Sequence, residues 1–116
     1  MLTFQFNGAE GEMLTDALLT SGMVNQQVLL QFDTFWEDLL KTVVFVAGSV
    51  CRTVEIDLEN IHKTGTKVVI PPEVLIGGQR LFVGVYGHDS TNSDVTPTVM
   101  VKGPRIAFGA DPTEYP

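Results

Sequence analysis

The chain has 116 residues, which is the usual size of one domain and too short for two separate hydrophobic cores. Hydrophobic residues make up 44% of the sequence and charged residues only 18%, so burial of apolar area can offset the entropy of chain ordering, and the composition excludes a disordered segment. Seven basic residues against 14 acidic ones give a net charge of -7, which repels phosphate backbones and anionic lipids and argues against nucleic acid and membranes as partners.

Neither a membrane span nor an export signal is expected. The longest apolar runs, such as residues 43–47, are far shorter than the ~20 residues that cross a bilayer. No basic segment followed by an apolar stretch opens the chain, so no Sec-type signal is predicted. Cys51 is the single cysteine, which excludes an internal disulfide and is typical of a protein made in a reducing cytoplasm.

The first part of the chain repeatedly shows the spacing of two that places apolar residues on one face of a strand. This alternation predicts a strand over 2–6, ended by Gly8, and a second strand near 12–16. The stretch 13–23 also fits a short helix, because its leucines have helical spacing, and this alternative stays open.

A further strand over 26–32 is followed by signals for one helical turn near residues 34–40. Asp33 and Thr34 offer cap-type side chains for this turn. Four apolar residues have the spacing of a one-sided turn that packs on the rest of the domain: Phe35, Trp36, Leu39 and Leu40. We expect Trp36, the only tryptophan, to close the core; the alternative is an exposed anchor for a partner.

The stretch 41–47 is a run of β-branched and aromatic residues that predicts a central strand covered on both faces. Gly48–Ser49 predicts a two-residue hairpin turn, after which the chain returns as a strand over 50–58. On the returning strand, the pattern places Val50, Val54, Ile56 and Leu58 inward and Cys51, Thr53, Glu55 and Asp57 outward.

Four more strands are predicted in the second half of the chain, over 66–70, 80–86, 95–102 and 105–109. Prolines and polar or glycine-rich segments separate them, namely the loop 60–64, Pro71–Pro72, a helical turn at 73–75, Gly77–Gly78, the loop 89–94 and Gly103–Pro104. The stretch 110–116 holds two prolines and no periodic pattern, so it is interpreted as an exit linker.

Seven to nine short strands with frequent turn signals predict an all-β domain over 1–109. The expected architecture is a two-sheet antiparallel β-sandwich, immunoglobulin-like or jelly-roll-like, with a partly open barrel as the alternative. Six aromatic side chains are expected to interleave in the core: Phe4, Phe6, Phe32, Phe45, Phe82 and Phe108.

Catalytic chemistry is not indicated, so the chain is not expected to be an enzyme. His62 and His88 lie in or beside polar loops and outside any nucleophile motif. Ser49 lacks the second glycine of a nucleophile elbow, and Cys51 lies on an alternating strand, where an inert thiol is the usual case.

No metal site or cofactor is predicted either. The acidic row Glu55, Asp57 and Glu59 is typical of a solvated strand face, and the loop 89–94 departs from the spacing of a calcium loop. The glycine pairs do not precede a helix with the spacing of a phosphate cradle.

Three aromatic residues, Trp36, Tyr86 and Tyr115, have the chemistry to stack on sugar rings or to contact a partner. They are scattered along the chain and are more often core or linker residues. Trp36 and Tyr86 remain the candidate contact residues, and a carbohydrate-binding module is the alternative function.

Four segments together carry a resemblance to a known family: Phe35-Trp-Glu-Asp-Leu-Leu-Lys-Thr-Val-Val-Phe-Val-Ala-Gly48, Val69-Ile-Pro-Pro-Glu-Val-Leu75, Leu81-Phe-Val-Gly-Val-Tyr-Gly87 and Ile106-Ala-Phe-Gly-Ala-Asp-Pro112. In order and spacing, over residues 26–112, the chain resembles the N-terminal β-sandwich domain of phage and prophage tail proteins of Gram-positive bacteria, of the baseplate upper protein and receptor-binding fibre type.

The resemblance implies a virion structural protein, assembled in the bacterial cytoplasm, whose sandwich domain attaches to the virion through protein–protein contacts. The implied partners are other tail and baseplate proteins, and a homo-oligomer stays open. The matching residues are structural ones, so the resemblance indicates a fold and a setting and assigns no site.

Overall fold

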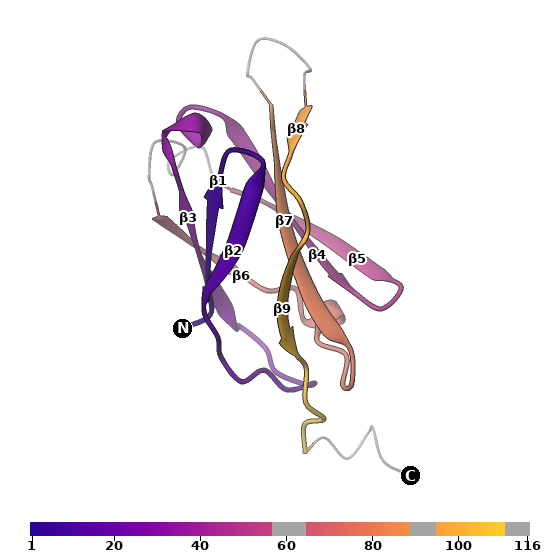
Figure 1. The fold of residues 1–116 in the computed structure, drawn as a ribbon. Helices are drawn as coiled ribbons and strands as arrows, with labels where there is room; N and C mark the ends of the chain where they lie inside the picture. Colours follow the sequence, from indigo (N-terminus) through magenta and orange to yellow (C-terminus); the bar gives the residue numbers. More distant parts are fainter. Residues whose placement is uncertain (57–64, 89–94, 111–116) are drawn as a thin grey trace.

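The computed structural model describes residues 1–56, 65–88 and 95–110. Within these ranges the chain forms nine strands and two single-turn 3-10 helices, and the strands make two sheets packed face to face (Figure 1). The predicted all-β, two-sheet architecture is confirmed.

The first sheet contains the N-terminal strands and one strand from the middle of the chain: β1 (Thr3–Asn7), β2 (Glu10–Thr15), β3 (Gln27–Phe32) and β6 (Gly65–Val69), in the order β2-β1-β3-β6. β3 runs parallel to β1, whereas the other pairs are antiparallel. An antiparallel sheet was predicted throughout. It does not form at this pair because β2 already returns the chain to the end of the sheet where β1 starts, and residues 16–26 stay at that end, so β3 leaves in the direction of β1.

The second sheet contains β4 (Leu40–Ala47), β5 (Val50–Glu55), β7 (Arg80–His88), β8 (Val95–Pro97) and β9 (Val101–Arg105). β4 lies between β5 and β7, as expected for its apolar sequence, while β8 and β9 pair in turn with β7. The predicted hairpin is confirmed: Ala47 pairs with Val50, and Gly48 has a φ of 58°, the positive value that a two-residue turn requires.

The predicted helical turns are both present as 3-10 turns, η1 (Thr34–Trp36) and η3 (Pro72–Val74). The stretch 13–23 is not helical. It completes β2 and then crosses the end of the sandwich as irregular chain, where Thr20 forms a bridge with Ala107.

The C-terminal strands differ from the prediction. Gly103–Pro104, expected as a connection, lies inside β9, and no strand covers 105–109. The pairing with β7 is irregular between Arg80 and Phe82, so two residues of β9 face one residue of β7. Such a bulge on an edge strand accommodates a proline, because its missing N–H leaves no ladder bond unmade.

The core lies between the sheets and includes four of the six predicted phenylalanines, which are at most 5% exposed: Phe4, Phe6, Phe32 and Phe45. Two assignments were wrong. Phe82 is only half-buried, because the inward positions of β7 belong to its neighbours Leu81 and Val83. Phe108 is 65% exposed and lies against Gly77 outside the core.

Candidate interaction surface

Trp36 closes the sandwich at one end. Its side chain is 0% exposed, and its Nε1 donates a hydrogen bond of 2.9 Å to the carbonyl oxygen of Gly8. The indole packs on the ring of Phe32, with centroids 5.9 Å apart, and Phe35 meets it edge-on at 5.6 Å. Phe35 was expected on the inner side of the turn but is 49% exposed. Trp36 therefore has the predicted core position, which leaves no face for stacking on a ligand.

Gly87 of β7 makes room for this packing. A Cβ atom placed on Gly87 would lie 2.7 Å from Cζ3 of Trp36 and 3.2 Å from the carbonyl oxygen of Leu40. Only a glycine fits this close approach of strand and indole. The sequence shows Gly87 within an apolar strand but does not show which side chain takes its place.

Tyr86, the other predicted contact residue, is half-buried on β7, where it pairs with Thr42 of β4 and Pro97 of β8. Gly87 faces inward, against Trp36. Neighbouring residues of a strand point to opposite faces of the sheet, so Tyr86 points to the outer face. The structure does not bring Trp36 and Tyr86 together. Tyr115 lies outside the described residues.

The residues considered for chemistry are dispersed. Ser49 occupies the β4–β5 turn, Cys51 is exposed on β5 and His88 is half-buried at the end of β7. Within the described ranges, no three metal-ligating side chains come together. Glu55 is exposed on β5, but the rest of its acidic row (Asp57 and Glu59), His62 and the loop 89–94 lie outside those ranges, as does the predicted linker from residue 111 on. That the chain is not an enzyme stays a prediction.

Lys41 is a buried cation that the sequence pattern did not reveal, since it opens an apolar strand. It is 4% exposed, donates from Nζ to the carbonyl oxygen of Leu39 at 3.0 Å and lies 5.4 Å from the centre of the Phe32 ring. Burial lowers the pKa of Lys41, and the nearby carboxylate of Asp38 opposes this in part. The group supports packing near Trp36 through its contact with the Phe32 ring.

The two sheets are joined along one side by main-chain hydrogen bonds at two places, which we call the upper and lower clasps. At the upper clasp, Val99 N donates to the carbonyl oxygen of Ala9 at 2.9 Å. At the lower clasp, Ala107 N donates to the carbonyl oxygen of Leu19, and Ser21 N donates to that of Ala107, both at 2.9 Å. β2 and β9 lie side by side between the clasps (Figure 1).

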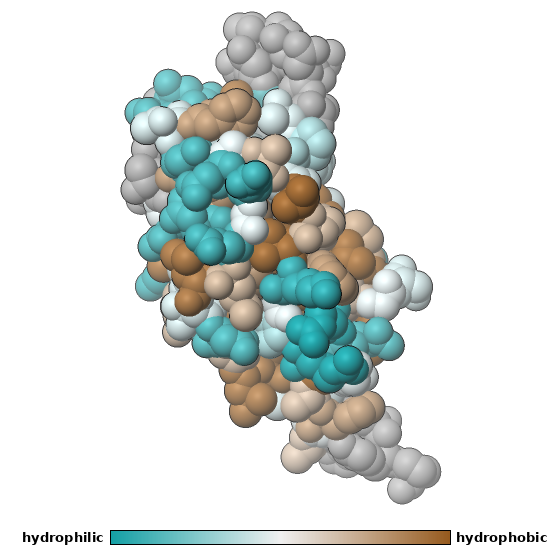
Figure 2. Space-filling model, in the orientation of Figure 1, coloured by the Kyte–Doolittle hydropathy of each residue, from teal (hydrophilic) through white to brown (hydrophobic). Residues whose placement is uncertain are grey.

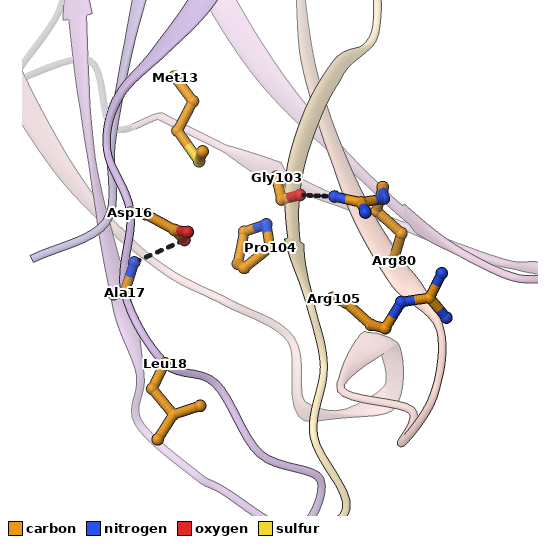
Figure 3. A pocket seen from close by; sticks show the side chains of 8 residues that line it. All are labelled: Met13, Asp16, Ala17, Leu18, Arg80, Gly103, Pro104 and Arg105. Carbon is orange, nitrogen blue, oxygen red and sulfur yellow. Dashed lines mark hydrogen bonds between the residues drawn. The ribbon is translucent and has the colours of Figure 1, made fainter.

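A groove of about 580 Å³ opens between β2 and β9 (Figure 3). Its lining comes from the end of β2 and the residues after it, from β7 and from β9: Met13, Asp16, Ala17, Leu18, Arg80, Gly103, Pro104 and Arg105. Asp16 points across the groove toward Pro104, whereas the guanidinium groups of Arg80 and Arg105 lie on the far side of β9.

The charged groups at this groove are held in place by the backbone. Arg80 Nη1 donates to the carbonyl oxygen of Gly103 at 2.9 Å, and Arg105 Nη1 donates to that of Gly78 at 2.7 Å. The carboxylate of Asp16 accepts from Ala17 N at 2.8 Å. Each guanidinium has five N–H donors, so these bonds orient the two arginines and leave most donors available.

Among the described residues, no helix has the length and apolar character that a bilayer span needs. Comparison of the chain with protein-family models, with curated proteins and with solved structures finds no match. The role of the chain must therefore be inferred from its residues and its surfaces.

Proposed function

We propose that the chain is a structural module of a phage or prophage virion, which attaches tail, baseplate or fibre components through protein–protein contacts. The proposal rests on one observation, the order and spacing of the four segments that resemble the N-terminal domain of such tail proteins. It places the protein in the virion, after assembly in the bacterial cytoplasm, and makes other tail or baseplate proteins its partners.

The positions of the four segments support a shared framework. The first segment forms most of η1 and all of β4, and the second forms the end of β6 and η3. The third forms most of β7, and the fourth follows β9. The first and third segments meet where Trp36 fills the space beside Gly87, and the fourth supplies Ala107 to the lower clasp. The resembling residues thus build the sandwich, as expected when a family shares a scaffold and varies its contact surfaces.

A carbohydrate-binding role has less support. Stacking on sugars requires exposed aromatic faces that line one groove. Trp36 is fully buried, and Tyr86 lies on the outer face of the sheet that contains β7. Neither residue lines the groove between β2 and β9.

Mass spectrometry of virions purified from cells that encode the chain tests the proposal. We expect the protein to co-purify with tail components and to be labelled at the tail by immunogold microscopy with an antibody against the domain. Its absence from purified particles would refute the proposal.

A further inference from the structure

Charges of opposite sign line the two strands that flank the groove. Glu10 and Glu12 on β2 and Asp16 just beyond it are exposed, and residues 10–18 contain no basic residue. On the other side lie three of the seven basic residues of the chain, Arg80 on β7 with Lys102 and Arg105 on β9, and neither strand contains an acidic residue.

The described residues of the two charged rows form no ion pairs with each other across the groove. Among the described residues, neither Arg80 nor Arg105 reaches a carboxylate, and each uses one donor on a backbone carbonyl. A chain of net charge -7 thus keeps a basic cluster beside an acidic row, and all of these residues are exposed except Arg80, which is half-buried. Such an arrangement favours a partner that has the opposite order of charges.

An apolar strip separates the two charged rows. Met13, Ala17 and Pro104 line the groove itself. Two exposed side chains extend the strip at its ends: Val99 at the upper clasp, which is 56% exposed, and Leu18 near the lower clasp, which is 76% exposed. Figure 2 shows this face with a hydrophobic area between two hydrophilic ones. An apolar centre with a charged rim is the usual composition of a protein interface.

We infer that this face binds a second copy of the same chain around a two-fold axis. If the axis lies in the interface along the apolar strip, a rotation by half a turn places the acidic row of each copy opposite the basic cluster of the other. Asp16 then faces Arg105, Glu12 faces Lys102, and both sets of contacts occur twice. The same surface is used by both copies, as closed two-fold dimers require.

The net charge of -7 on each copy does not prevent this contact at physiological salt. The Debye length there is ~8 Å, so repulsion between the distant acidic residues of two copies is screened while ion pairs in direct contact are weakened much less. The dimer is expected at moderate ionic strength and should weaken at ~1 M salt, where the contact pairs are screened as well.

Paired charge reversals in the full chain test the inference by sedimentation velocity. One variant carries Glu12→Lys and Asp16→Lys, and the other carries Lys102→Glu and Arg105→Glu. The wild-type chain should dimerise, and each variant alone should associate at least ~10-fold more weakly, because like charges then face each other. An equimolar mixture of the two variants should restore the dimer, since both rows of contacts become complementary again.

A matched control carries Arg52→Glu and Lys67→Glu, on β5 and β6 at the other side of the sandwich, with the same change in net charge as the second variant. It should dimerise like the wild type. If Lys102→Glu with Arg105→Glu impairs folding, judged by circular dichroism, the Glu12→Lys and Asp16→Lys variant alone still decides.

A wild-type chain that stays monomeric, variants that dimerise normally, or a folded variant mixture that stays monomeric would each overturn the inference. A monomeric chain that binds a fluorescent acidic peptide through Arg105 would assign the face to another partner. The inference deepens the proposed function by naming a partner and a surface, but it is tested in solution, so its failure leaves the assay on purified virions unaffected.

Discussion

At the scale of single residues, one end of the sandwich depends on side chains that fit one another closely. Trp36 joins the β1–β2 turn, through its hydrogen bond to Gly8, to the inner face of β7 at Gly87. The same indole contacts Phe32, whose ring also lies beneath the ammonium group of Lys41. Substitutions of Trp36 and of Lys41 should therefore change the free energy of unfolding of the whole domain.

Replacement of Trp36 by alanine should lower the free energy of unfolding by ~3 to 5 kcal/mol, because it leaves a cavity in the core and removes the hydrogen bond to Gly8. Thermal unfolding of the variant, followed by circular dichroism, measures the effect. The control is Phe35→Ala in the same turn, where half of the side chain is exposed and the change should be small. An unchanged melting temperature for Trp36→Ala would show that the core assignment is wrong.

Replacement of Lys41 by methionine should stabilise the protein near neutral pH. Burial holds the folded-state pKa of Lys41 below the usual 10.5, so between these two values the unfolded chain binds more protons and wild-type stability rises with pH. The free energy of unfolding that the methionine variant gains over the wild type is therefore largest below the lowered pKa, and it decreases as the pH rises toward 10.5.

Urea unfolding of both proteins at neutral pH and near pH ~10 measures this trend. Lys67→Met on β6, where the lysine is exposed, serves as the control and should change little at either pH. An advantage of Lys41→Met that stays constant across this range would contradict burial as the cause of the lowered pKa.

At the scale of elements, the parts predicted correctly are those whose signals are local. The β4–β5 hairpin follows from a β-branched run, a two-residue turn and the alternation after it, all within residues 40–55. The turn ending at Trp36 was likewise predicted from nearby residues, although Asp33, expected to cap it, makes no side-chain cap hydrogen bond. Local signals suffice where the partner strand follows directly in the chain.

The elements predicted wrongly depend on residues far apart in the sequence. Nothing near β3 shows that it runs beside β1 in the same direction. Gly103–Pro104 resembles a connection in sequence and becomes part of β9 only because β7 offers it an edge with a bulge. Phe108 has the alternation of a strand residue, yet its neighbours bond to the segment 19–21 and leave its ring outside.

The candidate surface was missed for the same reason. The acidic pair Glu10 and Glu12 and the basic pair Lys102 and Arg105 are visible in the sequence, but they lie about 90 residues apart and only the packing of the two sheets makes them neighbours. Catalytic, metal and sugar sites have residue patterns that a sequence can reveal, whereas an interface of this kind has no motif.

The lower clasp provides a test at this scale. Gly109 N donates to Ser21 Oγ at 2.9 Å, and a Cβ atom on Gly109 would collide with the carbonyl oxygen of Ser21. Gly109→Ala should therefore open the lower clasp while the strands stay paired. Hydrogen exchange should show loss of protection at the Ser21 and Ala107 amides, and no change in the β4–β7 pairing.

The control for this variant is Gly65→Ala at the start of β6, where the nearest atom to an added Cβ is 3.8 Å away. It should leave the protection of both amides intact. Retained protection in Gly109→Ala would mean that the backbone adjusts around the methyl group and that the clasp does not depend on this glycine.

At the scale of the whole molecule, the two sides of the sandwich differ. The side with β2 and β9 is held by backbone hydrogen bonds at both clasps, and its groove lies between them. On the opposite side, β5 and β6 flank a smaller groove of about 260 Å³, and no backbone hydrogen bond among the described residues joins these two strands. The closed side thus provides the firmer frame for the proposed dimer contact.

The clasps also determine when the domain can be completed during folding. The bond from Gly109 to Ser21 spans 88 residues, so the chain must leave the ribosome as far as residue 109 before the side of the sandwich can close. Contacts between residues so distant form late and slowly, and β-sandwiches that depend on them fold in ~ms to seconds. β2 is an edge strand of its sheet, and until the clasps close no β9 lies beside it, so it is open to pairing with another strand. The acidic row along β2 opposes such mispairing between nascent chains, because it repels its own copy in every alignment that lacks the basic cluster of β7 and β9.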